Sequence, residues 1–210
     1  MIEIFRLAED QAKLSSYRAA QNEDQAVQLE LAIELTKPKN KYTEWHDLIA
    51  TPFRYSPPLK IARFRAEFAR NVFYGSVNHQ VTYYEYSYHF MMERRHLKIK
   101  TETGQRTLFS VNADDRYAVY LHQHPHCKKI TDKNDYTASH HFVETNVDVS
   151  FIIYPSCRDP QKRDNAAIFD INVFEKNINN EIPVKYFYDN KKQVISWLYQ
   201  GLRVSWKQVS

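Results

Sequence analysis

RFRAEFARNVFYGSVNHQVTYYE spans residues 63–85 and presents three functional side chains at equal spacing. Arg63, Tyr74 and Glu85 follow one another at intervals of eleven residues, and Gly75 and Ser76 come directly after the tyrosine in a chain with only 3 glycines. A hydrophobic core needs neither the charged groups nor the glycine. The segment therefore predicts a polar pocket, and the sequence around it indicates which elements would form that pocket.

This segment is expected to be extended at first and then helical. NVFYG has the aromatic and β-branched composition of a strand and ends at Gly75. In VTYYEYSYHFMMERR, bulky residues recur at helical spacing: Val81, Tyr84, Tyr88 and Met91. Glu85 is thus expected to be presented from a helix, on the same side as Tyr88 and His89.

The sequence on either side contains more predicted strands than helices. TPFRY and RFR are interpreted as extended segments, and Asn134 and Asp135 are candidate caps for a helix at YTASHHFVETNV. Strands are predicted at RTLFSV, YAVYLH, VSFIIYPS, NAAIFDINVF, VKYFYD, QVISWLY and LRVSW. Because strands and helices do not alternate regularly, the pattern favours an α+β fold with antiparallel or mixed sheets.

The first 50 residues differ from the rest of the chain in amino-acid composition. From Glu9 to Lys37 the chain is rich in Ala, Leu, Glu and Gln, with Asn22 and Gln25 spaced as a capping pair, and this composition predicts two helices. The second has apolar residues at intervals of four: Val27, Leu31 and Leu35. KPKNK at 37–41 ends it. We therefore expect residues 1–50 to form an N-terminal helical extension packed on one compact domain, residues 51–210.

Composition restricts the class of protein. The chain has 210 residues, 43% of them hydrophobic, and 29 Lys and Arg scattered among 25 Asp and Glu, which is typical of one globular domain and offers no basic block for nucleic acid. The two cysteines, Cys127 and Cys157, form no CxxC pattern. We find no apolar run that resembles a signal peptide or a membrane span, so a cytoplasmic protein is expected.

A metal site is one alternative. LHQHPHC places three histidines at alternate positions with Cys127 beside them: His122, His124 and His126. Pro125 interrupts the strand that would align them, and no carboxylate stands at the usual spacing. No metal is therefore assigned.

A serine or cysteine nucleophile is a second alternative. Ser156 or Cys157 in YPSCRD could serve, but no GxSxG elbow surrounds either residue. A serine at the end of an apolar strand is often a turn former that bonds its own backbone.

A third chemistry uses Arg63, Tyr74 and Glu85 together with Ser156. An arginine matches a pyrophosphate, a tyrosine ring stacks on a flat heterocycle, and a carboxylate stabilises an oxocarbenium-like centre. This set suits the cleavage of an N-glycosidic bond. The plain structural alternative is that Arg63 pairs with a surface acid, Tyr74 is core, and Glu85 faces solvent.

Four segments in order are similar to the RES domain family, which is named after an arginine, a glutamate and a serine. They cover most of the chain: TPFRYSPPLKIARFR, NVFYGSVNHQVTYYE, ITDKNDYTASHHF and IIYPSCRDPQKRDNAAIF. Carried over by position, Arg63, Tyr74, Glu85 and Ser156 are the family's catalytic set. Gly75 and Ser76 would contact the substrate, and Arg54 in PFRY would be a second arginine near the phosphates.

The resemblance implies a fold like that of ADP-ribosyltransferase toxins and an activity that degrades NAD at the nicotinamide–ribose bond. It implies NAD as the substrate rather than a cofactor, with phosphate as a candidate co-substrate. It also implies a toxin paired with an antitoxin protein. Under it, Arg63 holds the pyrophosphate, Tyr74 stacks on nicotinamide, Glu85 orients the ribose, and Ser156 bonds the ribose or the acceptor.

The chain departs from the family pattern at three places. The family has small residues or glycines where this chain has Ile61-Ala62, Tyr83-Tyr84 and residues 162–164. Bulkier residues there would narrow or reshape the pocket.

Other functions therefore stay open: transfer of ADP-ribose to a macromolecule, or a non-catalytic partner-binding protein that uses the N-terminal helices. Exposed aromatic residues could also support a homodimer. Nothing in the charge distribution asks for a nucleic-acid or membrane partner.

Overall fold

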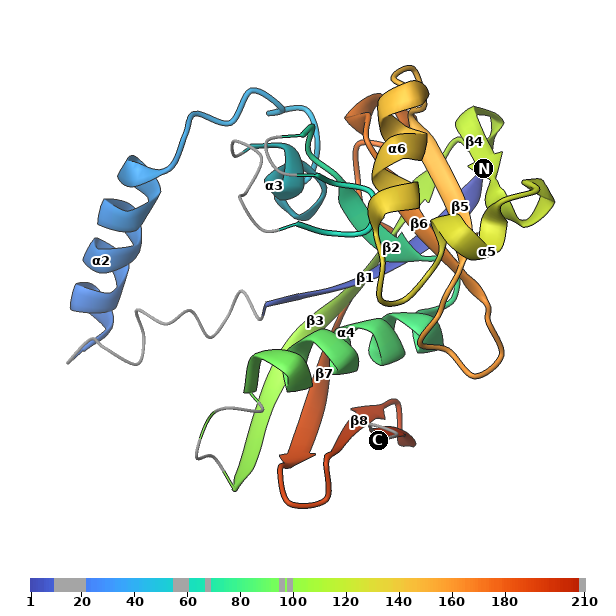
Figure 1. The fold of residues 1–210 in the computed structure, drawn as a ribbon. Helices are drawn as coiled ribbons and strands as arrows, with labels where there is room; N and C mark the ends of the chain where they lie inside the picture. The colour runs from blue at the N-terminus through green and yellow to red at the C-terminus, as the bar shows by residue number, and fades with distance from the viewer. Residues whose placement is uncertain (10–21, 55–60, 67–68, 95–96, 98–99, 208–210) are drawn as a thin grey trace.

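The computed structural model describes residues 1–9, 22–54, 61–66, 69–94, 97 and 100–207. In these residues nine strands form one sheet in the order β4-β5-β6-β2-β1-β3-β7-β8-β9 (Figure 1). Neighbouring strands are antiparallel, except that β4 and β5 are parallel. The predicted α+β class with a mixed sheet is confirmed.

The elements have the following bounds. The strands are β1 (Ile2–Glu9), β2 (Phe73–Ser76), β3 (Thr101–Ala113), β4 (Ala118–Tyr120), β5 (Phe151–Pro155), β6 (Asp164–Ile168), β7 (Asn180–Asp189), β8 (Val194–Tyr199) and β9 (Leu202–Lys207). The helices are α2 (Glu23–Thr36), α3 (Asp47–Arg54), α4 (His79–Arg94), α5 (Cys127–Ile130) and α6 (Thr137–Thr145), with 3₁₀ turns at Asp115–Tyr117, Leu121–Gln123 and Ile171–Val173. Among the helices described, none has the length and apolar composition that crossing a bilayer requires.

The first strand lies in the middle of the sheet. β1 pairs with β3 along its whole length, from Ile2 opposite Ala113 to Glu9 opposite Arg106, and it meets β2 at Phe5 and Ser76. The expectation of a helical extension over residues 1–50 is therefore wrong for β1. Its pairing partner is far away along the chain, so no local pattern reveals it.

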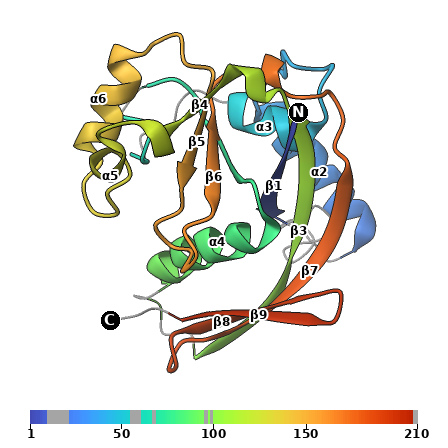
Figure 2. The same ribbon diagram turned by 90° about the vertical axis from the view of Figure 1, so that its right-hand side faces the viewer.

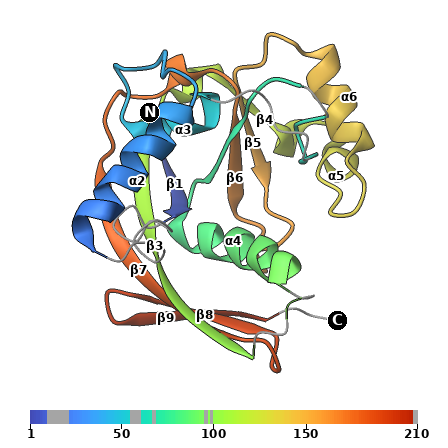
Figure 3. The ribbon, with the colours of Figure 1, turned by 90° about the vertical axis from the view of Figure 1, so that its left-hand side faces the viewer.

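One of the two expected N-terminal helices is present. α2 begins with the predicted cap, because Asn22 Oδ1 accepts a hydrogen bond from the Gln25 N–H at 2.8 Å. The other expected helix lies largely outside the described residues. The predicted apolar positions of α2 are exposed: Val27, Leu31 and Leu35. α2 lies on the opposite side of the molecule from α5 and α6 (Figure 3). The division of the chain at residue 50 stays a prediction.

The helix that carries Glu85 is enclosed by the curved sheet. β3 and β7 bend so that β8 and β9 pass on one side of α4, while β5 and β6 lie on the other (Figure 2). One face of α4 is buried against β7 and β8, where the Tyr83 ring stacks on Trp197 at 5.4 Å and the Trp197 Nε1–H bonds Ser87 Oγ at 2.8 Å. Because Tyr83 and Ser87 fix this face of α4 in the core, the neighbouring face of the helix lies toward a cavity.

Two predicted extended segments have other structures. TPFRY lies mostly in α3, where Leu48, Ile49 and Phe53 pack into the core. Their spacing is helical, and it outweighs the extended character suggested by Pro52. RFR forms a tight turn, closed by two backbone hydrogen bonds between Ala62 and Arg65 at 2.9 and 3.0 Å.

Candidate active site

A cavity of about 400 Å³ is bounded by β1, β2, α4, the 62–65 turn and the loop after β5. Five of the seven residues predicted for the site line it: Arg63, Tyr74, Gly75, Ser76 and Glu85. α4 contributes four residues that lie on one face of the helix: Thr82, Glu85, Tyr86 and His89. The structure thus brings the spaced arginine, tyrosine and glutamate to one cavity, while their roles stay predictions.

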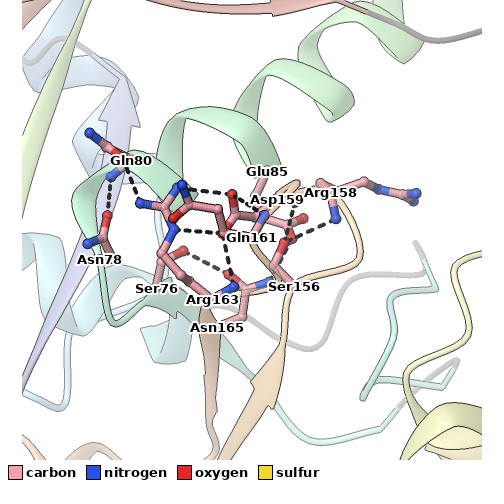
Figure 4. A network of polar contacts seen from close by, with 10 residues as sticks. All are labelled: Ser76, Asn78, Gln80, Glu85, Ser156, Arg158, Asp159, Gln161, Arg163 and Asn165. Carbon is pink, nitrogen blue, oxygen red and sulfur yellow. Dashed lines mark hydrogen bonds and ion pairs between the residues drawn. The ribbon is translucent and has the colours of Figure 1, made fainter.

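The Glu85 carboxylate is fixed through one of its two oxygens. Oε1 accepts hydrogen bonds from Ser156 Oγ at 2.5 Å and from Asn165 Nδ2 at 2.6 Å (Figure 4). No group in the described part of the chain donates a hydrogen bond to Oε2. Hydrogen bonds to an ionised acceptor are short and strong. One oxygen is therefore held in position, and the other is available to a ligand.

Ser156 holds the Glu85 carboxylate in position by a hydrogen bond. Its Oγ donates its single hydrogen to Glu85 and accepts hydrogen bonds from the N–H groups of Arg158 and Asp159 at 3.1 and 3.0 Å. The residue is only 1% exposed and is not among the described residues that line the cavity. Because this hydroxyl is buried and its proton is already shared, the geometry disfavours a serine nucleophile and favours a positioning role.

Asn165 is a site residue that the sequence reasoning missed. It is the second residue of β6, opposite Ser76 of β2, and its amide bridges two site residues: Nδ2 donates to Glu85, and Oδ1 accepts from Ser76 Oγ at 2.8 Å. Asn165 lines the cavity and is 3% exposed. The available signal was a polar residue at the start of an otherwise apolar strand, since buried amides need hydrogen-bond partners.

Arg63 is buried at the rim of the cavity. It is 8% exposed, and its Nη1 and Nη2 donate to the Asp132 carbonyl at 2.5 Å and to Cys157 Sγ at 3.1 Å. Its guanidinium also lies over the Tyr136 ring, 5.1 Å from the centroid. The structure thus places Arg63 in the cavity wall rather than in a surface ion pair with an acid of the described chain.

Tyr74 connects β2 to the turn that carries Arg63. The Phe64 N–H donates to the Tyr74 hydroxyl at 3.2 Å, and burial is the main cause that raises the pKa of this phenol to about 12. The side chain is therefore neutral at physiological pH. Its ring and hydroxyl line the cavity side of β2 while the hydroxyl fixes the turn.

Replacing Tyr74 by phenylalanine is expected to lower the free energy of unfolding by about 1–3 kcal/mol, because the buried Phe64 N–H loses its acceptor. Urea unfolding measures this change, with Tyr117→Phe at an exposed tyrosine as the control. Equal stabilities for the two variants would show that the Tyr74 hydroxyl does not hold the turn.

An ion pair closes the loop after β5. The Asp159 side chain is fully buried and accepts from Arg163 Nε at 2.7 Å and Nη2 at 2.9 Å, while Arg163 Nη1 donates to Gln80 Oε1 at 2.6 Å (Figure 4). The pair ties the loop to α4, and the same loop supplies Ser156. The pair therefore helps to position Glu85 indirectly.

Acid is expected to weaken this loop. Burial acts to raise the pKa of Asp159, but hydrogen bonds from Arg163 and from backbone N–H groups outweigh it and leave the pKa below 3.8. A lowered folded-state pKa contributes stability above the unfolded value, and that stability is lost as pH falls through the folded value. As the pH is lowered past about 4, the melting temperature should decrease. Asp159→Asn should make this decrease with pH less steep. An unchanged slope would contradict this role.

Arg54 is not in the site. It ends α3, and its Nε donates to the Pro38 carbonyl at 2.6 Å. Among the described residues that line the cavity, Arg54 does not appear. The structure does not bring Arg54 to the other predicted site residues, because α3 is a helix whose last residue directs this side chain to the Pro38 carbonyl.

Gly75 is required for a reason other than a turn. A Cβ at this position would lie 2.4 Å from Ile4 Cγ2 and 3.0 Å from the Phe5 carbonyl oxygen. Only glycine allows β1 to approach β2 this closely. Gly75 lies inside β2 and lines the cavity.

The departures from the family pattern have unequal effects on the cavity. Ile61 and Ala62 line it, whereas Tyr83 is fully buried against Trp197 in the core behind α4. Lys162 and Arg163 lie in the loop closed by Asp159, and Asp164 begins β6. Lys162 adopts a φ of 52°, a conformation that favours glycine. Of the three departures, only Ile61-Ala62 therefore places larger side chains in the lining of the cavity.

The histidine cluster forms no metal site in the described residues, where no group of three or more His, Cys, Asp or Glu could hold an ion. His122 Nε2 lies 2.5 Å from Asp164 Oδ1, while the rings of His124 and His126 lie 5.8 Å apart. Pro125 separates a 3₁₀ turn from α5, so the three rings do not share a strand face.

The lining of the cavity is cationic. Four arginines contribute to it: Arg6, Arg63, Arg65 and Arg158. Among the described lining residues the sole acid is Glu85. This balance favours an anionic ligand with a locally positive group beside the carboxylate. Arg6 was missed because residues 1–50 were predicted to be an extension outside the domain that carries the site.

Comparison with known proteins gives one family. The sequence matches the RES domain over residues 36–188, which is more than half of the chain. No curated protein matches it. RES domains are known from NAD-degrading toxins. The matched region contains the predicted arginine, tyrosine, glutamate and serine, all of which lie in or directly behind the cavity. The chain belongs to the RES domain family.

Proposed function

We propose that the protein degrades NAD by cleaving the bond between nicotinamide and ribose. The observation that supports this most is the Glu85 carboxylate, which is held through one oxygen by Ser156 and Asn165 in a cavity whose described lining includes four arginines and no other acid. NAD carries a negative diphosphate and a positive pyridinium, and the cavity offers cations and one anion to match. The cleaved bond would lie beside Glu85.

Glu85 would act by electrostatic stabilisation. When the C–N bond to nicotinamide breaks, its electron pair goes to the ring nitrogen, nicotinamide leaves neutral, and the ribose carbon becomes oxocarbenium-like. The free Oε2 would orient a ribose hydroxyl and offset this positive charge, which is worth most in a partly desolvated site. An oxygen of water or phosphate then bonds the ribose carbon, and with water a proton is released. No acid is needed for a neutral leaving group.

The other site residues would position the substrate. Arg63 would contact the diphosphate side of the molecule through donors not used by Asp132 and Cys157. The Tyr74 ring, presented from β2, would stack against nicotinamide. Ser76 and Asn165 would act through Glu85 by fixing its carboxylate, as would Ser156.

Product analysis tests this proposal. The purified protein is incubated with NAD, with and without phosphate, and nicotinamide and the ADP-ribose product are quantified. Free ADP-ribose indicates hydrolysis, and a phosphorylated ADP-ribose formed only with phosphate indicates phosphorolysis. With labelled NAD, label retained on a macromolecule would instead indicate an ADP-ribosyltransferase. Intact NAD under all conditions would refute NAD degradation.

NAD degradation would make the protein toxic to its own cell, as expected of the toxin in a toxin–antitoxin pair. Expression of the unmodified chain should then arrest growth and deplete cellular NAD, whereas Glu85→Gln should do neither. Growth arrest by both forms would show that toxicity does not depend on this site.

A further inference from the structure

A second cavity of about 460 Å³ adjoins the first between α3, α4 and β1. The two cavities share four lining residues: Arg6, Leu7, Tyr86 and His89. Arg6 of β1 thus lies at the junction of both. Apart from Glu93 and Thr51, the other residues that line the second cavity are apolar or aromatic, and they include Leu48 and Phe90. Its composition suits a neutral heterocycle and its sugar.

Arg6 has no protein partner for its charge among the described residues. Its Nη1 is shielded from solvent and makes no hydrogen bond, and its guanidinium lies over the Phe73 ring, 4.6 Å from the centroid. Burial lowers the pKa of Arg6 to about 10, so the group stays charged at neutral pH. Two partly buried arginines elsewhere pair with acids: Arg94 with Glu102 and Arg163 with Asp159.

We infer that Arg6 binds the diphosphate of the dinucleotide at the junction, so that the adenosine half occupies the second cavity and the nicotinamide half the first. The identity of the ligand rests on the proposed function. An unpaired guanidinium is costly to bury, and an anionic ligand removes that cost. Arg63 already donates to a carbonyl and a thiol, so only its remaining donors would reach the diphosphate, from the side of the first cavity.

The order of groups in the ligand matches the order of groups along the two cavities. Glu85 in the first cavity would hold the nicotinamide ribose, and the diphosphate is the next group along the molecule. Glu93 is the acid that lines the second cavity within the described chain. A carboxylate there disfavours the diphosphate but tolerates neutral adenosine. Arg6 thus has the phosphate-binding role that the sequence analysis predicted for Arg54.

Arg6→Met tests the arginine with probes that cannot react at a nicotinamide bond. Binding of ADP and of inorganic pyrophosphate is measured by titration calorimetry. Both should weaken by roughly 10- to 100-fold in Arg6→Met, as expected for loss of a hydrogen-bonded charge pair. Arg116→Met, which alters an exposed arginine paired with Asp114, should bind both probes like the unmodified protein. ADP affinity unchanged in Arg6→Met, or lost in Arg63→Met alone, would overturn the inference.

Thr51→Trp tests the second cavity and does not depend on the stability of the arginine variant. Filling this cavity should weaken ADP binding while leaving pyrophosphate binding intact. Thr145→Trp is the matched control, because Thr145 is also an exposed helical threonine whose hydroxyl bonds the carbonyl four residues earlier, as Thr51 does. Equal weakening of both probes by Thr51→Trp, or of neither, would place adenosine elsewhere.

The two proposals fail separately. If the protein binds ADP through Arg6 and Thr51 but leaves NAD intact, the diphosphate site stands and the proposed catalysis falls. If it consumes NAD with the same KM in Arg6→Met as in the unmodified chain, catalysis stands and the assignment of Arg6 falls. Removal of an unpaired buried charge should also raise the melting temperature of ligand-free Arg6→Met, a readout that needs no substrate.

Discussion

Glu85→Gln is expected to consume NAD ~10²- to 10³-fold more slowly than the unmodified protein, because it removes the negative charge that stabilises the transition state. Glutamine has nearly the same shape, and its Oε1 can still accept hydrogen bonds from Ser156 and Asn165, so the fold should persist. The rate of nicotinamide release at saturating NAD gives kcat, and thermal unfolding verifies the fold.

Glu144→Gln is the control for this prediction. Glu144 is an exposed glutamate of α6, outside the described lining of the cavity. It should keep full activity. If Glu85→Gln released nicotinamide as fast as Glu144→Gln, the carboxylate would have no part in the chemistry, and the proposed function would lose its main support.

Asp159→Ala is expected to lower the free energy of unfolding by about 3 kcal/mol, the lower part of the range for removing one partner of a buried ion pair. It leaves Arg163 Nε and Nη2 without their carboxylate acceptors, and the 24% exposure of that side chain allows water to replace them only in part. The loop also supplies Ser156, so activity should fall as well. Denaturant unfolding and the rate of nicotinamide release measure the two effects.

Asp114→Ala provides the comparison. Asp114 forms an equally short ion pair with Arg116, but the Arg116 side chain is 83% exposed. Exposed pairs contribute only ~0–1 kcal/mol. Similar losses of stability in Asp159→Ala and Asp114→Ala would mean that the loop does not depend on its buried pair.

Local sequence predicted the parts of the fold that depend on local periodicity. The helix bearing Glu85 and the strand ending at Ser76 are present because their spacing and composition act within a few residues. β1 was missed because its stability comes from pairing with β3 about a hundred residues later. Likewise, α3 was misread because Pro52 obscured a short amphipathic helix.

The site was predictable only where the resemblance supplied positions. Arg63, Tyr74 and Glu85 stand eleven residues apart but lie in a turn, a strand and a helix, so no single periodicity brings them together. Local sequence could not place Asn165 or Arg6 in the site, because strand register positions the first and burial against Phe73 the second. Those contacts exist only once the sheet is assembled.

The most direct test of the central claim is a crystal structure of Glu85→Gln soaked with NAD. The account predicts intact NAD with its nicotinamide–ribose bond beside the side chain at position 85, and with its diphosphate near the arginines of the cavity wall. NAD bound on another surface, or a cavity that stays empty at saturating NAD, would contradict it.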